Sequence, residues 1–205
     1  MYDLSNIYLK MNLKSENFYN KIAFIYPLID IFLKPQKRKL FHKINDLPFG
    51  RLLEIGVGNG NHLKYYNTHD IIGIDNSKKM LDKAKNHQNK NVKLIHMDGE
   101  TLSFSDNVFD YVVLSHVIAV VKNPDKLLDE VYRVLKPNGQ VFILNHFTPN
   151  NYLKYIDTFF EKLATYLYFK SVFNVEDLNT IKKFKLINQV NVGLFSYFKI
   201  LIYQK

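Results

Sequence analysis

The sequence predicts a doubly wound α/β fold, in which helices cover both faces of a mostly parallel sheet. Short continuous apolar runs alternate with amphipathic stretches from residue 50 to about residue 147, a pattern typical of parallel strands joined by helices. Two further apolar runs, about 184–192 and 195–203, close the chain with Gly193 between them. A connection this short joins only antiparallel strands, so we expect the sheet to end in an antiparallel pair.

Each element of the central region follows from a local pattern. Ser77 is the predicted N-cap of a helix over 77–86, since a serine side chain accepts a hydrogen bond from the first turn. Residues 124–135 carry apolar side chains at helical spacing, and Pro137-Asn138-Gly139 is expected to end that helix. Five short apolar runs are the predicted parallel strands, at 51–55, 71–75, 92–96, 109–114 and 140–144.

Length and composition fit one globular domain with a short appendage. The chain has 205 residues, of which 47% are hydrophobic and 23% charged, the ordinary globular balance. The absence of cysteine excludes disulfides, cysteine-ligated zinc, iron–sulfur clusters and thiol nucleophiles, and no metal site is predicted. We expect the main domain over residues 49–205 and a helical cap over residues 1–48.

The first residues and the apolar runs indicate where in the cell the protein is expected. Met1–Lys10 has no apolar core bounded by small residues, so no secretory signal is expected. The longest apolar stretch, 22–33, is interrupted by Pro27 and Asp30 and is too short to span a bilayer. We therefore expect a cytoplasmic protein, in solution or peripheral on the inner face of the membrane.

The net charge of +9 favours polyanionic partners such as nucleic acid, anionic lipid or an acidic protein. The chain is also crowded with lysine, asparagine and isoleucine, as AT-rich coding would produce. The charge is therefore supporting evidence only.

A glycine-rich loop follows the first predicted strand. The chain there reads Glu54-Ile55-Gly56-Val57-Gly58-Asn59-Gly60-Asn61, and glycines let the backbone approach a ligand closely. Asn61 stands where a GxGxxG dinucleotide loop needs glycine, and the phosphate-binding GxxxxGK pattern is absent. Taken alone, the loop is weak evidence of a ligand site, since an ordinary tight turn is the alternative.

Two acids add context to this loop. Asp75 ends the second predicted strand, where a carboxylate can accept both ribose hydroxyls of a nucleoside. Asp98 follows the third, where it can accept a hydrogen bond from an adenine amino group. Three such sites in order, each at the end of a strand, predict a nucleoside-containing cofactor.

These residues resemble the class I S-adenosylmethionine-dependent methyltransferases. The resemblance implies a Rossmann-like sheet of seven strands whose last strand is antiparallel. It also implies S-adenosyl-L-methionine as cofactor and S-adenosyl-L-homocysteine as product. The matching stretches are 53–60, 73–77 with Met80, 97–100, 109–113 and 133–140.

The same resemblance implies the roles of the cofactor-binding residues. Glu54 and the loop would hold the methionine end, Asp75 the ribose and Asp98 the adenine. Ser115 and His116 would lie beside the methyl group. The full set of cofactor-binding residues is then Glu54, Gly56, Gly58, Gly60, Asp75, Asn76, Met80, Asp98, Gly99, Ser115 and His116.

The acceptor is suggested by a narrower resemblance, to bacterial phosphatidylethanolamine N-methyltransferases of the soluble, Rhodobacter type. Its most distinctive part is Asn145-His146-Phe147, which ends the fifth predicted strand. One departure is Pro27, which stands where that family has aspartate. Further matching positions are Tyr19, Ala23, Tyr26, Arg38, 117–121 and 193–195.

A lipid amine has a pKa near 10, like that of lysine, and must lose a proton before it attacks. His146 and His116 are the candidate bases, and Tyr26 could face the methylated ammonium with its ring. Arg38 and its neighbouring lysines are candidates for the lipid phosphate. The expected substrate-binding residues are Tyr19, Tyr26, Arg38, Asn145 and His146.

Two amphipathic segments suit an enzyme that works on a phospholipid in an anionic membrane. Residues 18–33 are mostly apolar and are followed by a basic cluster, and residues 151–170 mix aromatic, aliphatic and basic side chains at helical spacing. Both segments could instead form helices that only cover the cofactor and bury their apolar faces on the sheet.

Other functions stay open at this point. A quinone or other small-molecule methyltransferase would also act at a membrane. An RNA methyltransferase would suit the positive charge, but no nucleic acid is expected because the chain has no appended RNA-binding module and no Asn-Pro-Pro-Tyr-like motif at 114–117. A non-catalytic peripheral binder is the alternative outside the enzymes.

Overall fold

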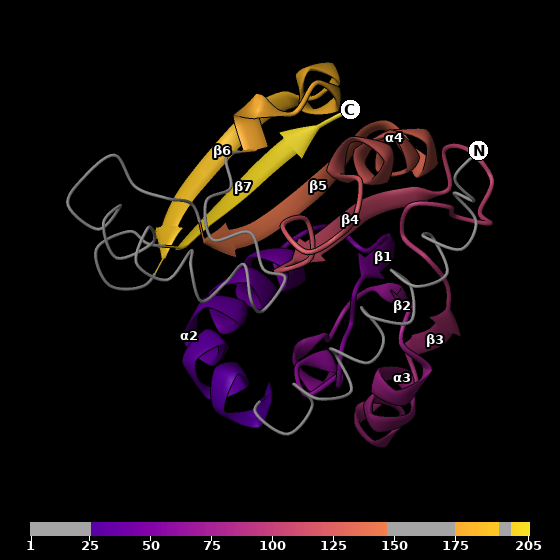
Figure 1. The fold of residues 1–205 in the computed structure, drawn as a ribbon, viewed down its shortest axis with the longest axis vertical. Coiled ribbons are helices and arrows are strands. Elements are labelled where there is room, and N and C mark those ends of the chain that lie inside the picture. Colours follow the sequence, from indigo (N-terminus) through magenta and orange to yellow (C-terminus); the bar gives the residue numbers. More distant parts are fainter. Residues whose placement is uncertain (1–25, 147–174, 193–197) are drawn as a thin grey trace, which may run out of the picture. The chain divides into compact units, whose positions relative to one another are not determined.

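The computed structural model describes residues 26–146, 175–192 and 198–205. A seven-stranded sheet has the order β3-β2-β1-β4-β5-β7-β6 (Figure 1). Strand β7 is antiparallel to both β5 and β6, and the other neighbouring strands are parallel. The predicted fold class is therefore confirmed, including the antiparallel last strand. The strands are β1 Arg51–Ile55, β2 Asp70–Asp75, β3 Val92–His96, β4 Phe109–Ser115, β5 Leu135–His146, β6 Lys185–Val192 and β7 Phe198–Gln204.

The helices begin where the sequence offers capping groups. Ser77 Oγ accepts a hydrogen bond from the Met80 N–H at 3.3 Å, which confirms the predicted N-cap. Asn123 caps the next helix in the same way, and Pro124 fills its first turn. The α-helices are α2 Tyr26–Asn45, α3 Lys78–Ala84 and α4 Pro124–Val134, and the 3₁₀ helices are η1 Leu63–Tyr65, η2 Lys85–His87, η3 Val175–Asp177 and η4 Thr180–Lys183.

Strand β5 begins earlier than the predicted run 140–144. It starts at Leu135, directly after α4, because Leu135 pairs with Phe109 before the register shifts. Asn138 has a φ of +65°, a conformation that asparagine tolerates better than most residues. Residues 137–139, which were expected to end the preceding helix, therefore form an irregular stretch within β5.

The chain divides into two compact units, 1–34 and 35–205. In the first unit the structure describes the backbone of the first residues of α2. The helix expected over 18–33 is confirmed only for its part from Tyr26. The segment expected over 151–170 lies outside the described residues, as does Tyr19.

Apolar side chains cover both faces of the sheet. Alternate residues of β1 belong to different clusters, since successive side chains of a strand point to opposite faces. Leu53 and Ile55 pack with α4, whereas Leu52 packs with the second half of α2. By this alternation Glu54 points to the same face as Leu52, toward residues that follow the glycine loop.

Candidate cofactor and acceptor site

The glycine loop turns back on the sheet in a conformation that only glycine adopts readily. Gly56, Gly58 and Gly60 have φ angles of +77°, +56° and +71°. The N–H groups of Gly56 and Val57 both donate to Ile74 O, at 2.8 and 3.0 Å, and so fasten the loop to β2. A Cβ on Gly60 would lie 2.7 Å from Ala84 Cβ, so no side chain fits there.

Asp75 joins the end of β2 to this loop. Its two carboxylate oxygens accept hydrogen bonds from the N–H groups of Gly58 and Ser77, both at 2.8 Å. Burial raises the pKa of Asp75, and the two N–H groups and nearby His96 oppose that rise. Because a carboxylate oxygen can accept two hydrogen bonds, Asp75 keeps capacity for the hydroxyls of a ribose. Of the neighbouring predicted residues, Asn76 is exposed and Met80 is buried.

The loop after β3 packs against the end of β1. A Cβ on Gly99 would lie 2.6 Å from Ile55 Cγ2, so glycine allows this close approach. Asp98 is exposed, and its Oδ1 accepts the Glu100 N–H at 2.9 Å. The structure thus brings Asp98 and Gly99 to the same edge of the sheet as the glycine loop.

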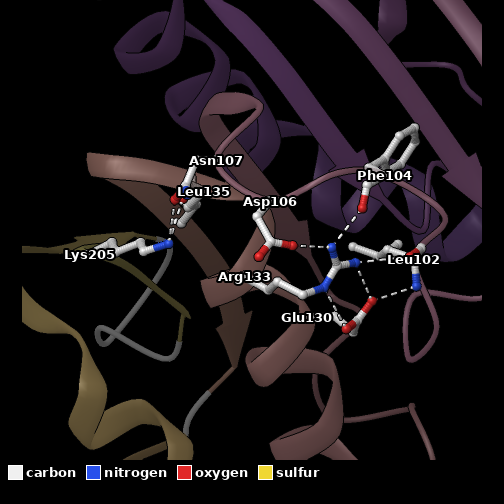
Figure 2. A network of polar contacts seen from close by, with 8 residues as sticks. All are labelled: Leu102, Phe104, Asp106, Asn107, Glu130, Arg133, Leu135 and Lys205. Carbon is white, nitrogen blue, oxygen red and sulfur yellow. Dashed lines mark hydrogen bonds and ion pairs between the residues drawn. The ribbon is translucent and has the colours of Figure 1, made fainter.

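Arg133 on α4 holds this loop in place (Figure 2). Its guanidinium donates to Phe104 O at 2.6 Å and to Leu102 O at 2.9 Å, and it pairs with Glu130 and Asp106, both at 2.8 Å. Glu130 also accepts the Leu102 N–H at 2.7 Å. The sequence analysis used Arg133 only as part of a resemblance and missed this role, because the three loop residues that it contacts lie 27 to 31 positions away.

A buried acidic site lies beside the glycine loop. Glu54 is fully buried, and the Tyr66 hydroxyl donates to its Oε2 at 2.9 Å. His62 Nε2 lies 2.7 Å from Oε1, an ion-pair distance, but its direction is not that of a hydrogen bond. Phe41 stacks on the His62 ring at 5.1 Å. The sequence analysis missed Tyr66 and His62, which flank the 3₁₀ helix η1, because no local pattern relates them to Glu54.

Polar groups also gather where β4 and β5 end. Ser115 and Asn145 are buried, and within the described part of the chain Ser115 Oγ and Asn145 Nδ2 have no hydrogen-bond partner. His116 has a φ of +59°, and its N–H donates to Leu144 O at 2.8 Å. Its ring meets the Phe198 ring edge-on at 5.7 Å. Ser115, His116 and Asn145 therefore lie at one edge of the sheet, but the Ser115 and Asn145 side chains point to opposite faces, because Ser115 pairs with Leu144.

The remaining predicted acceptor residues are placed less fully. The backbone of His146 pairs with Phe198, and Tyr26 begins α2, but both side chains lie outside the described part. Arg38 is exposed on α2, whereas its neighbour Lys37 is 7% exposed. Among the described residues, no three His, Asp or Glu side chains form a group that could hold a metal ion. Within the same ranges, no helix is both long and apolar enough to cross a bilayer.

The site fits the cofactor that the sequence suggests. S-adenosylmethionine has a cationic amino group, ribose hydroxyls and an adenine, and Glu54, Asp75 and Asp98 offer carboxylates at three successive strand ends. Glu54 Oε1 is buried and accepts no hydrogen bond within the described ranges, so it retains acceptor capacity for an ammonium group. The glycines supply the close backbone approach.

Comparisons with known proteins agree with this cofactor assignment. The family model for a methyltransferase domain matches residues 53–143. A phosphatidylethanolamine N-methyltransferase from Cereibacter sphaeroides is 30% identical over 160 residues, which cover 73% of this chain and 79% of that protein. A demethylmenaquinone methyltransferase from a Geobacillus species is 40% identical over 84 residues, covering 39% of this chain and 36% of that protein. An uncharacterised protein of Methanocaldococcus jannaschii is 41% identical over 97 residues, covering 47% of this chain and 45% of that protein.

Solved structures show the same fold. A possible histamine N-methyltransferase from Thermotoga maritima has a TM-score of 0.72 at 22% identity, covering 92% of this chain and 99% of that one. A phosphoethanolamine N-methyltransferase from Haemonchus contortus, solved with S-adenosyl-L-methionine, has a TM-score of 0.67 at 20% identity, covering 83% and 52%. At these identities the likeness concerns the fold alone. Together with the relatives in sequence and the cofactor site, it shows that the chain belongs to the class I S-adenosylmethionine-dependent methyltransferases.

Proposed function

We propose that this protein transfers a methyl group from S-adenosylmethionine to the amine of phosphatidylethanolamine and its methylated derivatives, towards phosphatidylcholine. One observation carries the proposal. The similarity to the Cereibacter enzyme extends over 160 residues, well beyond the 53–143 region of the family model. It therefore includes parts of the chain outside the cofactor-binding region, where we expect the acceptor to bind.

The residues of the site have distinct tasks in this proposal. When bound, the cofactor supplies a methyl group already activated by its sulfonium charge, so the protein mainly aligns the reactants and excludes water. Glu54, the glycine loop, Asp75 and Asp98 would hold the methionine, ribose and adenine parts. These residues stand on strand ends that hydrogen bonds fix to one another.

The polar groups at the ends of β4 and β5 suit a headgroup amine. A buried hydroxyl or amide without a partner is costly, and a polar ligand would satisfy Ser115 Oγ or, on the opposite face of the sheet, Asn145 Nδ2. The amine must be unprotonated to react, and His116 is a candidate to accept its proton. His146 and Tyr26 remain candidates from the sequence alone.

Basic residues on α2 suit an anionic membrane surface. Arg38 and Lys39 are exposed, and Lys39 Nζ donates to Asn191 O at 3.5 Å, next to the carboxyl end of β6. Each such charge near an anionic surface contributes about 1 kcal/mol to binding. We infer that the protein docks peripherally on the inner face of the cytoplasmic membrane, with Arg38 near the lipid phosphates.

A quinone methyltransferase is the second candidate. The observation that favours it is the 40% identity with the Geobacillus demethylmenaquinone methyltransferase. That similarity covers 84 residues. The alignment with another demethylmenaquinone methyltransferase, from Staphylococcus saprophyticus, is longer, at 32% identity over 139 residues and 60% of this chain, but it is still shorter than the 160 residues aligned with the Cereibacter enzyme. It carries less information on the acceptor than the longer alignment does.

Methyl transfer from labelled S-adenosylmethionine to vesicles tests both candidates. Vesicles of phosphatidylethanolamine, with and without anionic lipid, are compared with vesicles that contain demethylmenaquinone, and the lipids are extracted and separated. Label in mono-, di- or trimethylated phosphatidylethanolamine, increasing with anionic lipid, is the expected result. Label only in the quinone, or no label in lipid from a protein that binds the cofactor, would refute the proposal. If neither lipid is labelled, RNA is the next acceptor to test.

A further inference from the structure

A hydrogen bond closes the glycine loop into a ring. Tyr66 follows the loop, twelve residues beyond Glu54, and its hydroxyl returns to the Glu54 carboxylate at 2.9 Å. Between them, Gly60 N–H donates to Val57 O and Leu63 N–H donates to Gly60 O. The far side of the loop is thereby tied to the strand that precedes it.

Tyr66 is a rigid donor. Its ring is 2% exposed and meets Phe41 edge-on at 4.8 Å. Its backbone is also held, since the Tyr66 N–H donates to Leu63 O and Asn89 Nδ2 donates to Tyr66 O. Burial and the adjacent Glu54 raise the pKa of Tyr66 well above its ordinary value. The hydroxyl therefore keeps its proton and serves as a hydrogen-bond donor to the Glu54 carboxylate.

The two carboxylate oxygens of Glu54 have different surroundings. Oε2 accepts the Tyr66 hydroxyl, whereas buried Oε1 lies 2.7 Å from His62 Nε2 and accepts no hydrogen bond from the residues that the structure describes. We propose that Tyr66 is a positioning residue for the cofactor, which acts by fixing the Glu54 carboxylate so that Oε1 remains available to the ammonium of the methionine end. The inference rests on the cofactor assignment and is independent of the acceptor.

Binding of two ligands distinguishes a role of Tyr66 in positioning Glu54 from a role in stabilising the fold. S-adenosylhomocysteine carries the amino acid end, whereas 5′-methylthioadenosine has the same adenosine and thioether but no ammonium group. Tyr66→Phe removes the hydroxyl and keeps the ring. The neighbouring Tyr65→Phe is the matched control, because Tyr65 contacts the same Phe41 ring at 6.2 Å, while the hydroxyl that donates to Glu54 is that of Tyr66.

Titration calorimetry of each variant with each ligand gives the test. For Tyr66→Phe we expect the Kd for S-adenosylhomocysteine to rise on the order of tenfold, the loss of one hydrogen bond to a charged group. The Kd for methylthioadenosine should stay within about twofold of wild type, since this ligand has no group for Glu54 to bind. Tyr65→Phe should change neither. Equal losses for both ligands, or no loss for S-adenosylhomocysteine, would overturn the proposal.

A double-mutant cycle keeps the test valid if Tyr66→Phe also lowers stability. Glu54→Gln should weaken S-adenosylhomocysteine binding, and the Glu54→Gln/Tyr66→Phe protein should bind no more weakly than Glu54→Gln alone. Additive losses would show that Tyr66 does not act through Glu54. No acceptor is present in these titrations, so a negative result with lipid vesicles would leave the outcome unaffected.

Discussion

Gly56 and Val117 pack so closely that a Cβ on Gly56 would lie 2.1 Å from Val117 Cγ2. Gly56 follows β1 and Val117 follows β4, so the contact joins two neighbouring strand ends. Gly56 also has a φ of +77°. Two independent reasons, backbone conformation and space, therefore require glycine at this position.

Gly56→Ala should destabilise the protein by roughly 2–5 kcal/mol, the sum of a left-handed alanine and an overpacked contact. Urea denaturation measures the loss, and calorimetry should show weaker S-adenosylhomocysteine binding. Adding Val117→Ala removes the overlap but leaves the φ strain, so the double variant should recover only part of the stability. A Gly56→Ala protein as stable as wild type would contradict this packing.

Glu130→Gln should lower stability at pH 7 by about 1–2 kcal/mol, because it weakens the charged hydrogen bonds to Arg133. Hydrogen bonds from Arg133 hold the pKa of Glu130 below its ordinary value, despite partial burial. A carboxylate with a lowered pKa stabilises the fold above its unfolded pKa, and this stabilisation is lost as the pH falls through the folded pKa. The difference between wild type and variant should therefore shrink in acid.

Denaturation at pH 7 and at about pH 3 checks this pH dependence. Asp129→Asn on the same helix is the control, because exposed Asp129 makes a single surface ion pair with Lys183 at 2.8 Å and should change stability little. A difference between wild type and Glu130→Gln that does not depend on pH would show that the charge of Glu130 is not what stabilises the loop.

Ser115→Ala should leave stability unchanged or slightly higher, because its buried hydroxyl has no partner among the described residues. The same change at Ser77 should cost about 1 kcal/mol, since Ser77 Oγ caps α3. If Ser115 instead contacts bound substrate, Ser115→Ala should raise the KM or lower kcat. A Ser115→Ala protein less stable than Ser77→Ala would mean that the hydroxyl is satisfied in the free protein.

His116→Asn should lower turnover about 10²- to 10⁴-fold if His116 accepts the amine proton. Asparagine tolerates the φ of +59° at this position, so the backbone should be undisturbed, and calorimetry with S-adenosylhomocysteine separates any loss of cofactor binding from the loss of turnover. Labelled methyl transfer to phosphatidylethanolamine vesicles is measured across the pH range, with His146→Asn alongside. Undiminished turnover in His116→Asn, with loss in His146→Asn, would assign the base to His146.

Arg38→Gln/Lys39→Gln should weaken binding to anionic vesicles on the order of tenfold, because two charges near the surface are removed. Lys78→Gln/Lys79→Gln removes the same charge from exposed positions on α3 and should have much less effect. Vesicle co-sedimentation at low and high salt measures both, and the difference should fall as salt rises. Equal losses would indicate attraction through net charge rather than docking through α2.

Short-range patterns predicted most of the fold. The strands at 71–75 and 92–96 could be predicted from the sequence, because their patterns depend on neighbouring residues. The same holds for the helix cap at Ser77. Strand β5 was predicted too short because its first residue is extended by pairing with Phe109, a contact across 26 positions. Such pairing leaves no trace in local hydropathy.

The sequence by itself determined the sheet, its antiparallel last strand and the strand ends at which the carboxylates proposed for the cofactor stand, because strand ends and glycines carry local signals. Only the tertiary structure decided how those groups are held: Tyr66 and His62 beside Glu54, Arg133 on the loop that follows β3, and Ser115 with Asn145 at neighbouring strand ends. These contacts join residues that are separated along the chain, and their geometry depends on how the whole sheet twists and packs. Local propensity therefore predicts where the site lies, and long-range packing sets the orientation of its side chains.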